Sequence, residues 1–97
     1  MFGNPQDEAS KLGRAVKAIA ESAGGSKVSF DLGKVGEAVR KHRKGVALYV
    51  GSLCNSAEKD PSVLQLAQIV ALAYFVEFND RSLVQKVEDR ARALGVG

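Results

Sequence analysis

The sequence predicts an all-α protein, in which a compact bundle of four to five short helices surrounds a central apolar helix. Two observations support this prediction. Apolar residues recur every three to four positions along most of the chain, as they do on one face of an amphipathic helix. Asn, Asp, Pro and Gly residues, which commonly begin or end helices, separate these segments. With 97 residues, the chain has room for a single domain over 1–97.

The first predicted helix begins at Asn4 and Pro5. An Asn side chain accepts hydrogen bonds from the free amides of an opening turn, and Pro is tolerated at the first helical position. The apolar stripe that follows consists of Ala9, Leu12, Val16, Ile19, Ala20 and Ala23. We expect Gly24 and Gly25 to end this helix, because glycine readily adopts the conformation that closes one.

The second predicted helix begins at Asp31 and runs to about Lys44, where Gly45 stops it. Its apolar face consists of Leu32, Val35, Ala38, Val39 and His42. The basic residues of the segment take the other face. We expect His42 to lie at the edge of the core, with a ring nitrogen bonded to the backbone.

Residues 46–50 fit two structures. They could form a buried strand paired with 27–30, which would make the fold α+β, or the first part of a helix that runs to about Glu58. A lone pair of strands is rarely stable, so the helix is favoured.

The fourth predicted helix begins at Asp60 and Pro61 and runs to about Phe78. From Ile69 to Val76 it is apolar on every side, so it must be covered by its neighbours or by a second copy of the chain. A homodimer would supply that second copy. After a break at Asn79 and Asp80, the last helix begins with a predicted capping box, in which Ser82 and Gln85 satisfy the free amides of the first turn.

Small residues are abundant, with 13 Ala and 10 Gly, so we expect the helices to approach one another closely.

Other features of the composition exclude several classes of protein. One cysteine and one histidine supply neither an internal disulfide nor a usual zinc site. Neither a signal peptide nor the roughly 20 apolar residues of a membrane span is present. We therefore expect a cytoplasmic protein with no metal and no cofactor.

A catalytic site is not expected either. A nucleophilic Cys54 would need His42 within hydrogen-bond reach and a third group to orient the histidine, and no such group is evident. Cys54 lies among apolar residues and fits the core better. The chain is therefore predicted not to be an enzyme.

Positive charge is concentrated in one segment, which sets the candidate binding site. Between positions 34 and 44 only Glu37 is acidic, whereas the basic residues are Lys34, Arg40, Lys41, Arg43 and Lys44. This segment carries more than the whole net charge of +3. Such a face can meet an acidic protein surface or the phosphates of a nucleic acid, or it can simply be the solvated side of an amphipathic helix.

Aromatic residues mark a second candidate surface. Tyr74, Phe75 and Phe78 fit the core, but any exposed part of this cluster would suit a protein interface, where aromatic side chains are frequent anchors.

These features predict a small, non-enzymatic interaction or regulatory module. We expect it to bind another macromolecule, in the first place a protein, through the basic segment and an exposed part of the fourth helix. The alternative is a nucleic-acid-binding accessory protein that contacts phosphates through residues 40–44. Sequence-specific reading of a groove is not expected, because the residues that would face the bases, Val46 to Tyr49, are almost entirely apolar.

Overall fold

The chain folds into five α-helices and one short 3-10 helix in the computed structural model, which describes residues 4–22 and 32–95. The elements are α1 (Pro5–Ser22), α2 (Leu32–Lys41), the 3-10 helix η1 (Arg43–Gly45), α3 (Val46–Ser56), α4 (Val63–Phe78) and α5 (Ser82–Ala93). No strand occurs among these residues. The predicted all-α fold is confirmed, and residues 46–50 are helical. The proposed strand at 27–30, the cap at Asp31 and the stop at Gly24 and Gly25 lie outside the described residues.

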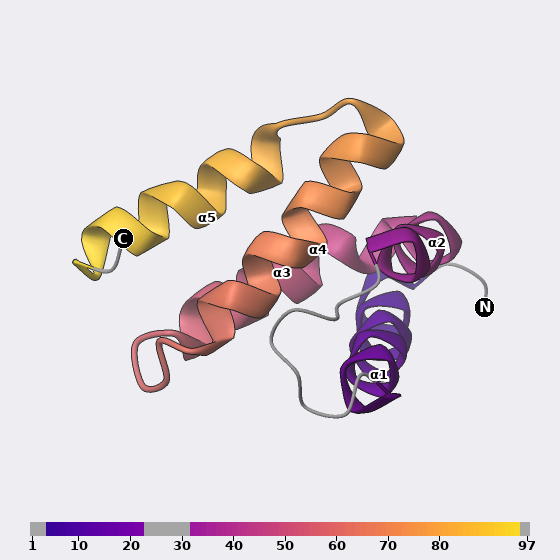
Figure 1. The fold of residues 1–97 in the computed structure, drawn as a ribbon, viewed down its shortest axis with the longest axis horizontal. Coiled ribbons are helices and arrows are strands. Elements are labelled where there is room, and N and C mark those ends of the chain that lie inside the picture. Colours follow the sequence, from indigo (N-terminus) through magenta and orange to yellow (C-terminus); the bar gives the residue numbers. More distant parts are fainter. Residues whose placement is uncertain (1–3, 23–31, 96–97) are drawn as a thin grey trace.

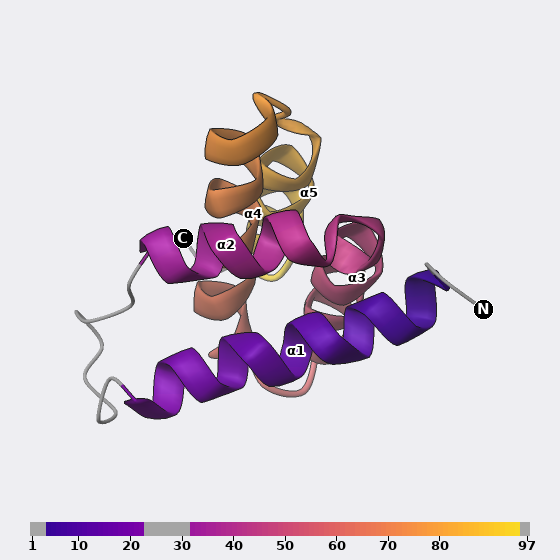
Figure 2. The ribbon, with the colours of Figure 1, turned by 90° about the vertical axis from the view of Figure 1, so that its right-hand side faces the viewer.

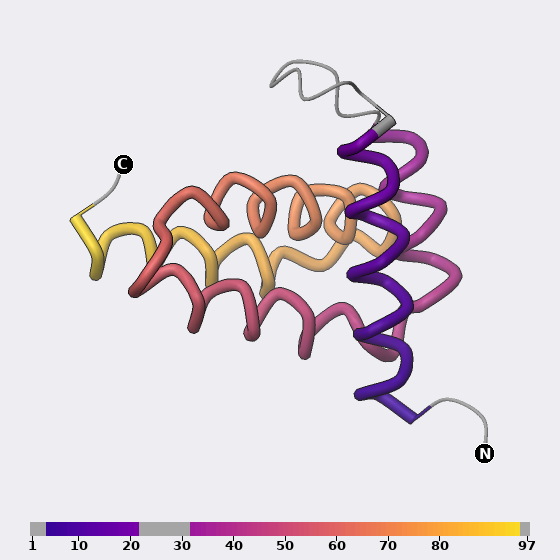
Figure 3. Tube along the Cα trace, turned by 90° about the horizontal axis from the view of Figure 1, so that it is seen from below, coloured from indigo at the N-terminus to yellow at the C-terminus, as the bar shows by residue number. Residues whose placement is uncertain are grey.

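The helices form two groups. α3, α4 and α5 lie alongside one another, and α1 and α2 lie side by side across one end of them (Figures 1 and 3). Figure 2 looks at α1 and α2 from the side, with the other three helices seen obliquely behind them. The radius of gyration is 12.6 Å, close to the value of about 13 Å for a compact domain of this length.

A short polar side chain accepts a backbone hydrogen bond at, or just before, the start of three helices. In each case a side-chain oxygen accepts from the N–H of the residue two positions further on. Asn4 accepts from Gln6 at 2.9 Å, Asp60 from Ser62 at 3.2 Å and Asp80 from Ser82 at 2.9 Å. The predicted start at Asn4 is confirmed. The predicted start at Asp60 and Pro61 is too early, because α4 begins at Val63 and the residues before it form tighter turns, in which the amides of Val63 and Leu64 donate to the carbonyls of Asp60 and Pro61.

The predicted capping box at Ser82 is wrong. Ser82 already lies inside α5, and the amide of Gln85 donates to Asp89, one turn further on, instead of reaching back to the helix start. The N-cap position belongs to Arg81, and the amide of Ser82 donates instead to the Asp80 carboxylate, in a turn directly before the helix.

The second helix is shorter than predicted. α2 ends at Lys41, and the chain tightens into η1 before α3 begins. Glycine explains this tight junction: a Cβ atom at the buried Gly45 would overlap the backbone of Glu8 and Ala9 in α1. The expected close approach of helices through small residues is therefore present, and it fixes α1 against the α2–α3 corner.

α4 is the central helix, as predicted, since it packs against α2, α3 and α5. Around it lies a valine-rich core, whose largest fully buried side chains are Leu12, Val16, Val35, Val39, Val46, Val50, Val70 and Val87. None of the helices in the described ranges has both the length and the apolar character needed to cross a membrane.

The chain's own helices do not enclose α4, however. Leu72 is 45% exposed and Val76 is 62% exposed. Both belong to an uncovered side of α4 that also bears Gln65 and Gln68, and we call these four residues the open stripe. Of the two kinds of cover that the sequence allows, the neighbouring helices supply only a part, because α1 packs on α2, η1 and α3 and leaves this side of α4 uncovered.

Candidate interaction surface

All five residues of the predicted basic site, Lys34, Arg40, Lys41, Arg43 and Lys44, are exposed. The change from α2 to η1 divides them. Lys34, Arg40 and Lys41 belong to α2, whereas Arg43 and Lys44 belong to η1. The cations therefore do not form the single straight row that a continuous helix to Lys44 would have presented.

Two of the arginines are bound to the end of α4. Arg40 Nε donates to Glu77 Oε1 at 2.9 Å. Gly36 makes room for this ion pair, because a Cβ atom there would lie only 2.8 Å from the other carboxylate oxygen of Glu77. The guanidinium of Arg43 lies over the ring of Phe78, 4.4 Å from its centre, in a cation–π contact.

Arg43 also acts on Asp80, which lies just before α5. The pKa of Asp80 is lowered, chiefly by the hydrogen bonds from Ser82 and to a smaller extent by the charge of Arg43. Two of the cations of residues 40–44 thus have partners within the fold. Lys41 and Lys44, in contrast, form no ion pair with any residue in the described ranges.

The aromatic cluster is less open than its neighbours on α4. Tyr74, Phe75 and Phe78 are each partly buried. The rings of Tyr74 and Phe78 are tilted against one another, with centres 5.0 Å apart, and Arg43 covers Phe78.

The most exposed large apolar residues of α4 are instead Leu72 and Val76, which the sequence analysis did not single out. A signal for them existed. Gln65 and Gln68 mark the solvent side of α4, and continuing in steps of four residues leads to positions 72 and 76.

A groove borders the open stripe on the side of α5. It has a volume of about 220 Å³, and it is lined by Gln68, Ala71, Leu72, Val84, Val87 and Glu88. Apart from the two polar residues at its edge, its walls are aliphatic. The stripe and the groove together make a continuous, largely apolar surface on α4 and α5.

His42 and Cys54, which could have formed a catalytic pair, lie apart. They are separated by twelve residues of nearly continuous helical backbone, so they are on the order of 18 Å apart along the chain. The His42 side chain is 12% exposed, and its Nδ1 lies 3.4 Å from Glu8 Oε1. The expected position at the core edge is therefore confirmed, but the partner is a carboxylate of α1 and not the backbone.

Cys54 is buried in the core, as its apolar neighbours predict. Burial raises the pKa of its thiol, and the positive charges of Lys86 and Arg90 only partly oppose this shift. Arg90 is held nearby because its Nε donates to the Cys54 carbonyl at 3.1 Å. In the part of the chain that the structure describes, no group of three or more His, Cys, Asp or Glu side chains is placed to hold a metal ion.

Comparison of the chain with protein-family models, with curated proteins and with solved structures finds no match.

Proposed function

We propose that this chain is a small, non-enzymatic interaction module that binds a protein partner through the open stripe of α4. The observation that carries the proposal is the exposure of Leu72 and Val76, one turn apart, on a helix whose other sides are packed into the core. An apolar patch of this kind on a small protein suits a contact with another protein.

The surroundings of the stripe support this proposal. Protein interfaces combine an apolar centre with a polar, solvent-accessible rim. Here Leu72 and Val76 would form the centre, and the neighbouring groove can receive an apolar side chain of the partner. The Arg40–Glu77 ion pair lies beside the stripe, on the α2 side, and would belong to the rim. Through this ion pair, Arg40 of the basic segment is in contact with the end of α4.

A protein partner is favoured over nucleic acid because Arg40 and Arg43 already have partners within the chain. Of the four cations in residues 40–44, Lys41 and Lys44 are left to meet phosphates. When two phosphates are neutralised, the logarithm of the binding constant falls with the logarithm of the salt concentration with a slope of about −1.8, compared with about −3.6 for four phosphates. Fluorescence anisotropy with a random DNA duplex measures this slope, and a value near −3.6 would restore the nucleic-acid alternative.

The proposal is tested by affinity capture from a lysate of the source organism, treated with nuclease. We expect the wild-type chain to retain a protein that the double variant Leu72→Ser, Val76→Ser loses. Leu32→Ser is the matched control, since Leu32 is 38% exposed but lies on α2. The proposal fails if the double variant retains the same protein as the Leu32→Ser control. It also fails if the wild type and both variants retain a protein from untreated lysate but lose it after nuclease treatment.

A second copy of the chain is one form that the partner could take. Light scattering at tens of micromolar separates this case from a different protein. A doubled mass that returns to the monomer in the Leu72→Ser, Val76→Ser variant would identify a homodimer built on the open stripe. If both chains are monomers, the open stripe is left for a different protein.

We propose the cytoplasm as the compartment of this chain because Cys54 is a free thiol, as is usual where thiols are kept reduced.

A further inference from the structure

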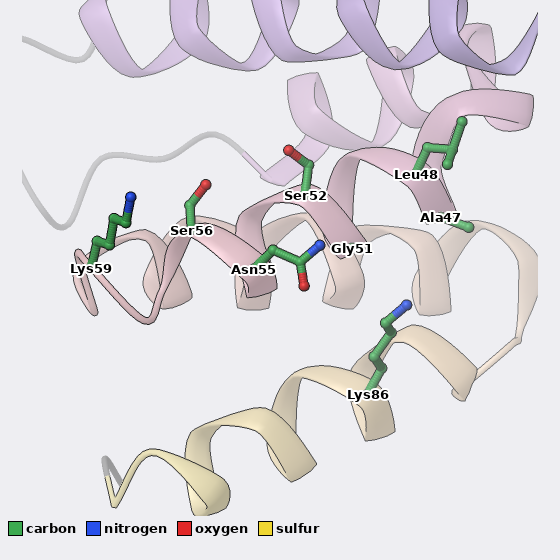
Figure 4. A pocket seen from close by; sticks show the side chains of 8 residues that line it. All are labelled: Ala47, Leu48, Gly51, Ser52, Asn55, Ser56, Lys59 and Lys86. Carbon is green, nitrogen blue, oxygen red and sulfur yellow. The ribbon is translucent and has the colours of Figure 1, made fainter.

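A second surface, on the outer side of α3, has features that the open stripe does not explain. It is a hollow of about 640 Å³, and its walls include Leu48, Gly51, Ser52, Asn55, Lys59 and Lys86 (Figure 4). Most of these residues belong to α3, whereas Lys86 reaches towards them from α5. The hollow is elongated in the direction of α3, because its lining follows that helix from Ala47 to Ser56 and on to Lys59.

The exposed face of α3 is unusual for a helix in contact with water. In a chain of which 26% is charged, the eleven residues of α3 include no charged side chain. Its exposed positions are Ala47, Leu48, Ser52, Asn55 and Ser56, and Leu48 is 47% exposed. The solvent side of an amphipathic helix normally carries charged residues. Small, uncharged side chains with one exposed leucine are suited to close contact with another helix.

Two lysines give the hollow a positive charge. Lys86 Nζ lies 3.4 Å from the position that a Cβ atom would take at Gly51, so its ammonium group sits over the middle of α3. Lys59 follows the last turn of the same helix, eight residues after Gly51, which corresponds to about 12 Å along a helix axis.

Neither lysine forms an ion pair with a described residue, and no acidic residue lines the hollow. An acidic occupant would therefore complement its charge.

We propose that this hollow binds one acidic helix of a protein partner, which lies along α3. Two carboxylates two turns apart on that helix, at positions i and i+7 or i+8, are spaced by about 10–12 Å and would meet Lys86 and Lys59. An apolar residue of the same helix would cover Leu48, and Ser52 and Asn55 would offer hydrogen bonds between the two charged contacts. The α3 surface is separate from the open stripe, so the chain would bring two partners together.

The proposal is tested with the full chain, labelled with 15N, and three designed helical peptides. The first peptide carries a leucine and two glutamates seven residues apart. The second has the same composition with its glutamates three residues apart, and the third has lysine in place of glutamate. We expect the first peptide to shift the amide signals of Gly51, Ser52 and Asn55. We also expect it to bind about threefold more tightly than the second, since the second can engage only one lysine at a time.

Variants identify the lysines that bind. The Lys59→Ala, Lys86→Ala double variant should lose about tenfold in affinity for the first peptide. Lys41→Ala, Lys44→Ala removes the same charge from exposed positions elsewhere and should leave the affinity unchanged. Equal affinity for the first two peptides, equal losses in both double variants, or shifts that fall at Leu72 and Val76 would each overturn the proposal. So would inorganic phosphate that produces the same α3 shifts while the first peptide produces none.

Discussion

Asn4, Asp60 and Asp80 each place one side-chain oxygen on a backbone amide two residues further on. This contact satisfies an amide that no preceding turn of helix can bind, at or just before a helix start. Asn4 and Asp60 were predicted to begin helices because the mechanism is local. Asp80 was predicted only to break the chain between two helices, and its contact with Ser82 is seen only in the structure.

The contact of Asp80 with Ser82 predicts that the stability of the fold falls in acid. The hydrogen bonds from Ser82, helped by the charge of Arg43, hold the pKa of Asp80 below the ordinary value of about 3.9. Its contribution is therefore complete above that value and is lost as the pH falls through the lower pKa of the folded state. We expect Asp80→Asn, which can still accept the hydrogen bond from Ser82 but does not titrate, to lose less thermal stability between pH 7 and pH 3 than the wild type. Circular dichroism during heating measures this difference, and equal losses would contradict it.

Cys54 gives a second prediction at this scale. Because burial raises the pKa of the thiol and keeps reagents away, Cys54 should react with a thiol reagent many times more slowly in the folded chain than in denaturant. A spectrophotometric thiol titration in the two states checks this. A fast reaction in the folded state would show an accessible, activated thiol and would reopen the question of catalysis.

At the scale of the elements, glycines decide which helices can touch. Gly45 lies directly against the backbone of α1, where nothing can move aside for a side chain, while at Gly51 an added methyl group would meet only the flexible end of Lys86. The two positions therefore form a natural pair for a test of the α1 contact.

We expect Gly45→Ala to destabilise the fold by about 1–3 kcal/mol through overpacking. Gly51→Ala should be neutral or stabilising by up to about 1 kcal/mol, because alanine is the better helix former. Urea unfolding of the two variants gives both values. If both substitutions change the free energy of unfolding by the same amount, the close approach of α1 is not the reason that residue 45 must be glycine.

The position of the open stripe cannot be predicted from α4 alone. The composition of α4 indicated a helix that needs cover on all sides, and three sides are covered. Which side stays open depends on the placement of α1, and no property of α4 itself contains that information. The sequence supplied a partial signal in Gln65 and Gln68, but the aromatic residues nearby drew attention to the buried side.

At the scale of the whole molecule, the contacts of α1 predict that it unfolds together with the other helices. It joins the rest of the fold through fully buried side chains such as Leu12 and Val16 and through the contact at Gly45. Leu12→Ala should therefore cost about 2–5 kcal/mol, a large part of the stability of a domain of this size. Leu48→Ala, at a half-exposed site, should stay within about 0.5 kcal/mol. Urea unfolding should show one transition in both variants, and a separate early transition of α1 would contradict a single cooperative unit.

The candidate surfaces were predictable only in part. The basic residues were found because charge is visible in the composition, and all five are exposed. That Arg40 would bind Glu77, and Arg43 would cover Phe78, was not predictable, since the partners are more than thirty residues apart in the sequence. The α3 hollow was missed as well, because it depends on Lys86 of α5 reaching across to Gly51.

By itself, the sequence determined the all-α fold, several of the helix ends and the central place of α4. These properties depend on hydrophobic periodicity and on caps that act over a few residues, so they are written locally in the chain. Only the tertiary structure decided that residues 46–50 are helical, which arginines are neutralised, and which sides of α3 and α4 remain open to a partner. Those outcomes depend on how helices that are distant in sequence compete for the same limited apolar surface, and that competition is resolved only when the whole chain packs together.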